Sequence, residues 1–247
     1  DGTHYRLFKN KVVNDLVCDI FCAFPGLLMT SRYRYEHIEH HRHLNSDNDP
    51  YTTFFKQHSD WNWPKKLSSA IWLFTRDLIG LNTLQEMKNI IKWTPFANHF
   101  NTADTPPPLS LTERISFYFF IASIVTTTWF FGAWVHMLLL WVVPVTALIL
   151  PFARFRTVAE HLAIPERSGD SAVRHVDGTW LEHIFIAPRN INYHATHHIF
   201  PGIPYFNLPD LHKRLMQETE YREFLHIKKT YLGFDKDKSV LGEVLSA

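Results

Sequence analysis

Hydrophobic residues are spread unevenly along the chain, and the longest apolar run lies in its middle. Residues 115–153 form 39 consecutive positions without Asp, Glu, Lys or Arg. As a helix this run would be roughly 58 Å long, about twice the roughly 30 Å of a bilayer core. It therefore predicts a hairpin of two membrane spans with its turn at Gly132. The alternative is a buried hairpin in a soluble protein, but the rest of the chain would hardly cover so long an uncharged stretch.

Basic residues flank this hairpin only at its outer ends. Arg114 precedes it, Arg154 and Arg156 follow it, and the turn at Gly132 has no basic residue nearby. Because positively charged flanks stay on the cytoplasmic side of a membrane, we expect both outer ends to face the cytoplasm.

Two further apolar stretches are too short to predict full spans. Residues 16–30 include Asp19, and residues 67–81 include Arg76 and Asp77. Both favour interfacial or re-entrant helices. A polar tail follows residue 204 and predicts one more helix at about 209–219. The sequence as a whole predicts an all-α, polytopic membrane protein.

Composition narrows the possible partners. Lys plus Arg number 25 and Asp plus Glu 24, for a net charge of +1. Nucleic-acid binding needs a clustered basic excess, so a nucleic-acid partner is not expected. Cys18 and Cys22 lie in an apolar run and predict buried, reduced thiols. Because the chain begins with Asp1 rather than Met, we expect further residues upstream.

The 16 histidines include two groups with the same spacing. One lies in YEHIEHHRHL and the other in YHATHHIF, and both read H-x-x-H-H. Positions i, i+3 and i+4 lie on one face of a helix, so each group would aim three imidazoles at one point. Six imidazoles exceed the four ligands of a tetrahedral zinc site, which favours two metal ions or one ion with surplus histidines. The six residues are His37, His40, His41, His194, His197 and His198.

Two more histidines are candidates at the same membrane face. An even number of spans between the two groups returns the chain to its starting side, so the groups can meet there. His161 follows Arg154 by seven residues, and a continuing helix would carry it about 10 Å beyond the membrane boundary. It is either a ligand or a hydrogen-bonded structural residue. His4 lies in DGTHYRLFKN at the start of the chain.

The sequences DGTH, HIEHH and NYHATHH resemble the three histidine boxes of the integral-membrane fatty acid desaturases and their hydroxylase relatives. Flanking stretches agree with this, namely HHRHLNSDNDP, RTVAEHLAIP and PRNINYHATHHIFPGIPYFNLPDLH. The resemblance covers nearly the whole chain and implies a single desaturase-like domain over 1–247. The given sequence lacks two features of the family, namely a first-box histidine that would precede Asp1 and the first membrane spans.

This resemblance implies a cytoplasmic helical cap that holds two irons, which use O2 to desaturate a fatty acyl or other lipid chain. The implied iron ligands are His4, His37, His40, His41, His161, His194, His197 and His198. It further implies a multi-pass protein of the bacterial inner membrane or the endoplasmic reticulum, with the boxes on the cytoplasmic side. No haem-binding HPGG signature is present, so a separate ferredoxin or cytochrome b5 would supply electrons.

Two other functions are compatible with the same sequence features. A hydroxylase or ketolase of the same superfamily would act on a sphingolipid, carotenoid or alkane with the same boxes. A non-catalytic metal-binding or transport protein would place its ligands inside the spans, where the hairpin has only His136. Four carboxylates could orient the ligand rings, although a surface or capping role is the more usual one for each, namely Asp47, Asp49, Glu160 and Asp210. Surface or hydrogen-bonding roles are expected for His58, His99, His175, His183, His212 and His226.

Overall fold

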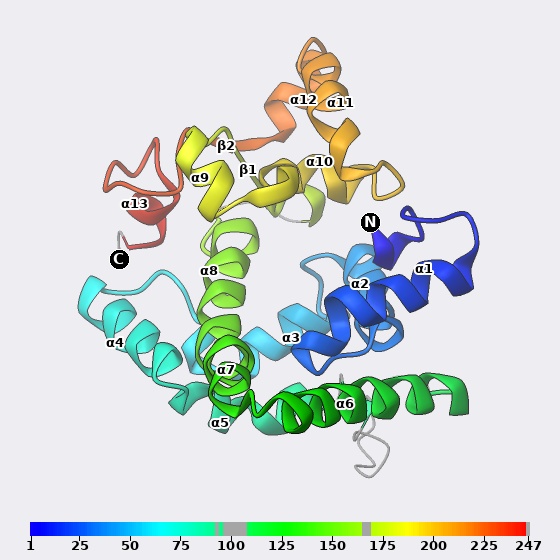
Figure 1. Cartoon of the computed structure of the whole chain (residues 1–247). Helices are drawn as coiled ribbons and strands as arrows, with labels where there is room; N and C mark the ends of the chain where they lie inside the picture. Colours follow the sequence, from blue (N-terminus) through cyan, green and yellow to red (C-terminus); the bar gives the residue numbers. More distant parts are fainter. Residues whose placement is uncertain (92–93, 96–107, 165–168, 246–247) are drawn as a thin grey trace. The chain divides into compact units, whose positions relative to one another are not determined.

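The computed structural model describes residues 1–91, 94–95, 108–164 and 169–245, and these residues are mostly helical (Figure 1). The predicted helical class is confirmed. The chain divides into two compact units. The unit here called the span unit comprises Gly2–Ile38 and Thr75–Phe152. The other, called the histidine unit, comprises Asp1, Glu39–Phe74 and Ala153–Ala247. The single domain expected from the sequence stays a prediction.

Three helices run from one unit into the other, and the rest belong to one unit each. The continuous ones are α2 (Thr30–His43), α4 (Leu67–Leu78) and α8 (Ile149–His161). The span unit adds α1 (Lys11–Cys18), α5 (Leu81–Ile90), α6 (Leu111–Phe131) and α7 (Trp134–Met137). The histidine unit adds α3 (Pro50–Gln57), β1 (Arg174–Val176), α9 (Trp180–Phe185), α10 (His194–Ile199), α11 (Leu208–Leu215), α12 (Thr219–Phe224), β2 (His226–Lys228) and α13 (Val240–Val244).

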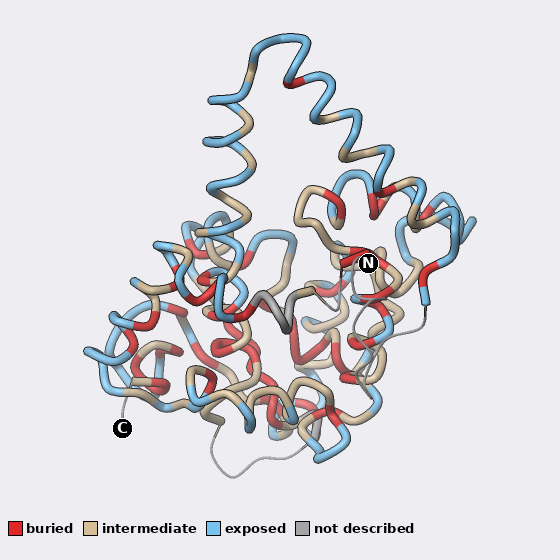
Figure 2. Tube along the Cα trace, turned by 90° about the horizontal axis from the view of Figure 1, so that it is seen from below, coloured by how far each residue is buried: buried red, intermediate tan, exposed pale blue. Residues whose placement is uncertain are grey.

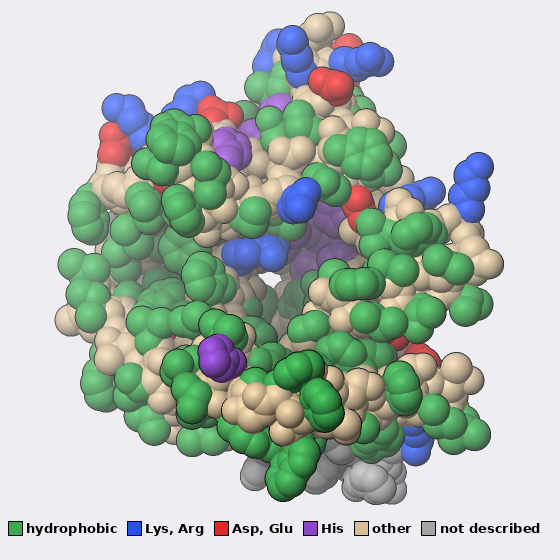
Figure 3. All heavy atoms as spheres, in the orientation of Figure 1, with side chains coloured by type: hydrophobic (Ala, Val, Ile, Leu, Met, Phe, Trp, Pro, Cys, Tyr) green, Lys and Arg blue, Asp and Glu red, His purple; other side chains and the backbone are tan. Residues whose placement is uncertain are grey.

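Two helices are long and apolar enough to cross a membrane, and the sequence predicted both. They span Leu111–Phe131 and Trp134–His161. Only 11% and 6% of the residues in their most apolar windows are buried, so their side chains face outward rather than into a protein core (Figure 2). Figure 3 shows mostly hydrophobic side chains over α6 and α7. An exposed apolar surface of this kind marks a site of interaction with a membrane or with another protein.

Local signals place the break between the two spans. Ser110 and Glu113 form a capping box that starts α6. Gly132 ends α6 in the left-handed conformation, with φ of +61°, which a residue without a Cβ adopts freely. The expected turn at Gly132 is confirmed, while the helices extend beyond the predicted limits of 115 and 153.

The second span contains two π-helical turns, Leu138–Val142 and Pro144–Leu148. In a π-helical turn, a carbonyl accepts from the N–H five residues later, and for Thr146 that residue is Pro151, which has none. The Thr83 hydroxyl of α5 donates to this carbonyl at 2.7 Å. A polar side chain thus satisfies a backbone group within an apolar helix.

The N-terminal apolar stretch is bent rather than straight. The helical segments Lys11–Gly26 and Thr30–His43 meet at 92° and are apolar enough to form a third, broken span or a re-entrant loop when taken together. Asp19 accepts a hydrogen bond from the Thr30 backbone N–H at 2.9 Å and fixes the bend. This geometry agrees with the re-entrant character expected for residues 16–30.

In the histidine unit, two small cores surround a pair of parallel strands. β1 pairs with β2 in the register Arg174 to His226. One core packs Val158 and Ala159 of α8 against residues near the C-terminus, and the other packs Ala195 of α10 against α12. These cores hold the ends of α8 and α10, where four of the predicted ligands lie. The predicted tail helix is divided into α11 and α12.

Candidate metal centre

Helix α2 carries the first H-x-x-H-H group, and a buried carboxylate orients one of its rings. His40 Nδ1 lies 3.0 Å from both oxygens of Asp49, whose side chain is almost completely buried. Asp49 also accepts from the backbone N–H groups of Asn45 and Tyr51, both at 2.9 Å. The Tyr51 ring stacks on His40 at 4.3 Å. With Nδ1 held in this way, Nε2 is the ring nitrogen that could bind a metal.

The end of α8 and the helix α10 bring three further imidazoles to His40. The ring centroids of His161 and His198 lie 4.8 and 5.0 Å from that of His40. His194 Nε2 lies 2.8 Å from His161 Nε2 and 3.1 Å from His198 Nε2. Glu160 places a carboxylate oxygen 3.5 Å from His194 Nε2. Possible ligand atoms of His40, His161 and His198 lie within 4.8 Å of one another, as do those of Glu160, His161 and His194.

These distances suit a metal held by neutral nitrogens. Two nitrogens that bind one ion at about 2.1 Å and at right angles lie about 3.0 Å apart. The Nε2 pairs of His194 match that separation. Burial, together with the neighbouring imidazoles, lowers the pKa of His194 and of His198 well below the usual value. Both rings are therefore neutral at pH 7, as metal binding requires.

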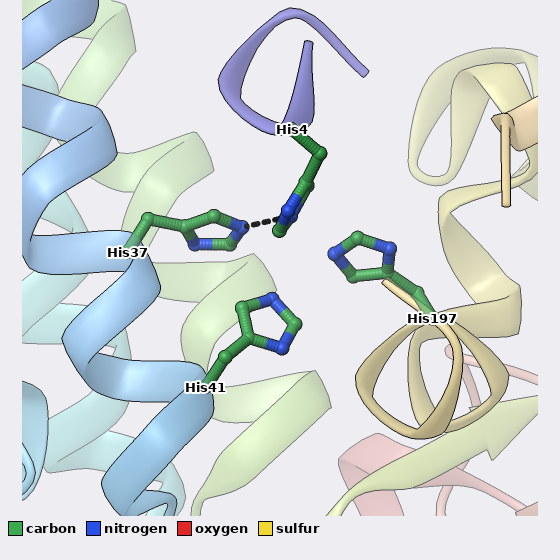
Figure 4. Close-up of side chains that lie close together, drawn as sticks. All are labelled: His4, His37, His41 and His197. Atoms are coloured by element: carbon green, nitrogen blue, oxygen red, sulfur yellow. Dashed lines mark hydrogen bonds between the residues drawn. The ribbon is translucent and has the colours of Figure 1, made fainter. Parts of the chain in front are cut away.

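The remaining four predicted ligands form two pairs, one in each unit. In the span unit, His4 Nε2 lies 3.1 Å from His37 Nε2 (Figure 4). Burial lowers the pKa of His4 to about 4, so this ring is neutral as well. In the histidine unit, the rings of His41 and His197 lie 4.9 Å apart. His37 and His41 occupy successive turns of α2.

Comparison with known proteins gives this arrangement a family. The model of the fatty acid desaturase family matches residues 1–230. The chain belongs to this family. It is similar to the dihydrorhizobitoxine desaturase of Bradyrhizobium elkanii, with 28% identity over 228 residues. That match covers 90% of this chain and 63% of the relative, so the chain spans less than two thirds of the relative's length. No solved structure matches the chain.

Within this desaturase-family chain, the candidate carboxylates take different positions. Asp49 contacts His40, and Glu160 lies beside His194. Asp47 is exposed and instead pairs with Lys56, while Asp210 lies in the first turn of α11. Glu160 is fixed by Arg156, which donates to it at 2.8 Å. His136, the histidine within the predicted hairpin, is exposed on α7, and His99, which is expected to have an ordinary role, lies outside the described residues.

The structure also reveals supports for α10 that the sequence did not indicate. Thr196, within the second H-x-x-H-H group, lies 2.8 Å from the Tyr221 hydroxyl and 3.2 Å from His212 Nδ1. Asn192 donates to the Val176 carbonyl at 3.0 Å and ties the helix start to β1. Thr, Tyr and Asn at these positions follow no recognisable spacing. Only a threonine between ligand histidines, on the opposite side of the helix, hints at such a support.

Proposed function

We propose that this protein is an O2-dependent membrane di-iron desaturase that introduces a double bond into a fatty acyl or other lipid chain. The proposal rests above all on the convergence of His40, His161, His194 and His198 at ligand distances in a desaturase-family chain. Neutral imidazole is a ligand set that iron accepts. It also withstands a strong oxidant, whereas a thiolate would be oxidised.

Two irons would be held by the eight expected ligands, and four of these, His40, His161, His194 and His198, converge within the histidine unit. Bound iron would supply the O2 activation needed to break an unactivated C–H bond. The chain's own residues orient the ligands: Asp49 fixes the His40 ring, and Arg156 fixes Glu160 beside His194. Burial lowers the pKa of His4, His194 and His198, which keeps these three rings neutral and ready to bind.

We further propose that the substrate enters from the bilayer, because two apolar helices expose their side chains. The histidine groups would face the cytoplasm, where a separate ferredoxin or cytochrome b5 delivers electrons. The name of the Bradyrhizobium elkanii relative indicates action on dihydrorhizobitoxine, which makes this compound a second substrate to test beside lipids.

Expression of the full-length protein in a host with a matching electron donor tests the proposal. We compare the lipid profiles and O2 consumption of cells that contain the wild type, a His198→Ala variant or a His136→Ala control. We expect new unsaturated products and O2 consumption with the wild type and the control, and neither with His198→Ala. Dihydrorhizobitoxine is assayed in parallel as a substrate.

Other outcomes would identify the competing functions. Hydroxylated or keto products would assign the chain to the hydroxylase or ketolase relatives. Bound zinc without O2 consumption would indicate a non-catalytic metal-binding or transport protein and would overturn the proposal.

A further inference from the structure

Arg174 of β1 lies at the end of α8, directly beside the carbonyl groups of its last turn. Its side chain is completely buried. Nη1 donates to the carbonyls of Val158 at 3.0 Å, Ala159 at 3.3 Å and Leu162 at 2.7 Å. Nη2 donates to the carbonyl of Ala163 at 2.9 Å. The last carbonyls of a helix have no partner within the helix, and a cation is favourable there. One guanidinium therefore caps the C-terminus of α8.

This end of α8 carries two members of the metal centre. Glu160 and His161 lie between the carbonyl groups that Arg174 binds. Their backbone positions are thus fixed from a strand that carries no proposed ligand. A small displacement of this turn would move His161 Nε2 away from its 2.8 Å neighbour, His194 Nε2.

The charge of Arg174 is balanced by Glu243 of α13. Arg174 and Glu243 form an ion pair at 2.7 Å, and Glu243 is 6% exposed. Glu243 also contacts Lys228 at 3.1 Å and His226 at 3.0 Å. An unpaired buried guanidinium would be costly, so Glu243 keeps Arg174 in place. The neighbouring cations and hydrogen bonds hold the pKa of Glu243 at about 2.

Packing joins the same elements. Val158 and Ala159 of α8 share a core with Tyr231, Val240 and Val244. The family match ends at residue 230, so Glu243, the partner of Arg174, lies beyond the matched residues.

We infer that Arg174 and Glu243 are positioning residues for the metal centre, acting through the end of α8 on His161. The inference rests on the proposed metal site. It adds to that site a requirement for the C-terminal segment 231–244, whose α13 supplies the carboxylate.

Titration of the purified, metal-free full-length protein with Co²⁺ tests this role. The variants are Arg174→Lys, which keeps the charge but not the fork of donors, and Glu243→Gln, which removes the balancing charge. We expect Co²⁺ affinity to fall by about tenfold or more in both, the range typical of residues that orient ligands. The d–d absorption of bound Co²⁺ should change as well, while helical content stays at the wild-type level.

Arg222→Lys is the matched control. Arg222 also donates to carbonyls just after a helix, those of Met216 at 2.9 Å and Gln217 at 3.3 Å, but α11 carries no proposed ligand. It should bind Co²⁺ as the wild type does.

The possible results of the Co²⁺ titration distinguish the positioning role from the metal site itself. Wild-type affinity and spectrum in Arg174→Lys and Glu243→Gln would overturn the positioning role. If a variant lost helical content together with its ability to bind Co²⁺, the positioning role would also be overturned, because the residues would then serve folding alone. Failure of the wild type to bind Co²⁺ would instead contradict the proposed metal site.

Discussion

The two H-x-x-H-H segments have the same spacing but are held in different ways. The first lies within α2, a 14-residue helix, and its most buried histidine is oriented by the carboxylate of Asp49. The second lies in α10, a helix of only six residues. There the support comes from Thr196, Tyr221 and His212 on the side away from the ligands.

This difference teaches what spacing does and does not determine. Spacing decides which imidazoles share a helix face, and it does so equally in both segments. It does not fix the rotation of a ring or the position of a short helix. In α2 a direct contact fixes the ring, whereas in α10 a network fixes the helix. Variants that remove each support separate these two kinds of control.

Removal of a ligand should have the largest effect. His161→Ala removes an imidazole that lies against His194 and His40, so we expect activity at the level of cells without the enzyme and a loss of bound iron. Iron analysis of the purified variant and product analysis measure both. His136→Ala, at an exposed position of α7, is the control. Full iron retention in His161→Ala would remove this residue from the ligand set.

Removal of the carboxylate that orients the His40 ring should have the second largest effect. Asp49→Asn weakens the interaction that orients His40, and we expect metal affinity to fall by about 10- to 100-fold. Competition with a chelator of known affinity measures the change. Asp47→Asn is the matched control, because Asp47 is exposed and forms an ion pair with Lys56 rather than with a ligand ring. Equal affinities of the two variants would show that Asp49 does not orient the ligand.

Removal of the network that holds α10 should lower the stability of the fold but leave the iron content almost unchanged. Tyr221→Phe deletes the hydroxyl near Thr196 and His212, a loss of about 0.5–1.5 kcal/mol. The thermal unfolding midpoint should fall by about 1–6 °C. Iron content should stay near the wild-type value. Tyr35→Phe, at an exposed position of α2, serves as the control. A loss of iron without a change in the midpoint would give Tyr221 a closer role at the metal.

The smallest effect concerns pH. Burial lowers the pKa of His212 from 6.5 to about 4, so between these values the folded protein binds fewer protons than the unfolded chain. The free energy of unfolding therefore falls as pH drops below 6.5. Thermal midpoints of the wild type and His212→Gln at pH 7.5 and 4.5 measure this. We expect a smaller drop in the variant, and an equal drop would contradict the role of His212.

Features that depend on a run or a repeat could be predicted from the sequence. The uncharged stretch predicted two spans because no soluble core could hold it, and Gly132 marked their break. The two histidine groups predicted ligand faces, and Asp49 was a candidate partner of a ligand ring. Local pattern carries all of this information.

Features that depend on contacts between distant residues could not. Arg174 reaches back to residues 158–163 and forward to Glu243, and nothing in its immediate sequence marks it as a helix cap. The pairing of β1 with β2 joins three-residue strands too short for a periodic pattern. The network around Thr196 depends on where α11 and α12 fold back onto α10.

The central claim is that the eight histidines hold two irons, and iron stoichiometry of the purified full-length protein tests it most directly. Metal analysis and Mössbauer spectroscopy of the iron-loaded wild type should give about two irons per chain. Replacement of His40 or of His197 by Ala should lower the occupancy of the two iron positions or abolish iron binding. A wild-type protein that is active with one iron or none, or one whose two irons survive both substitutions, would contradict the account.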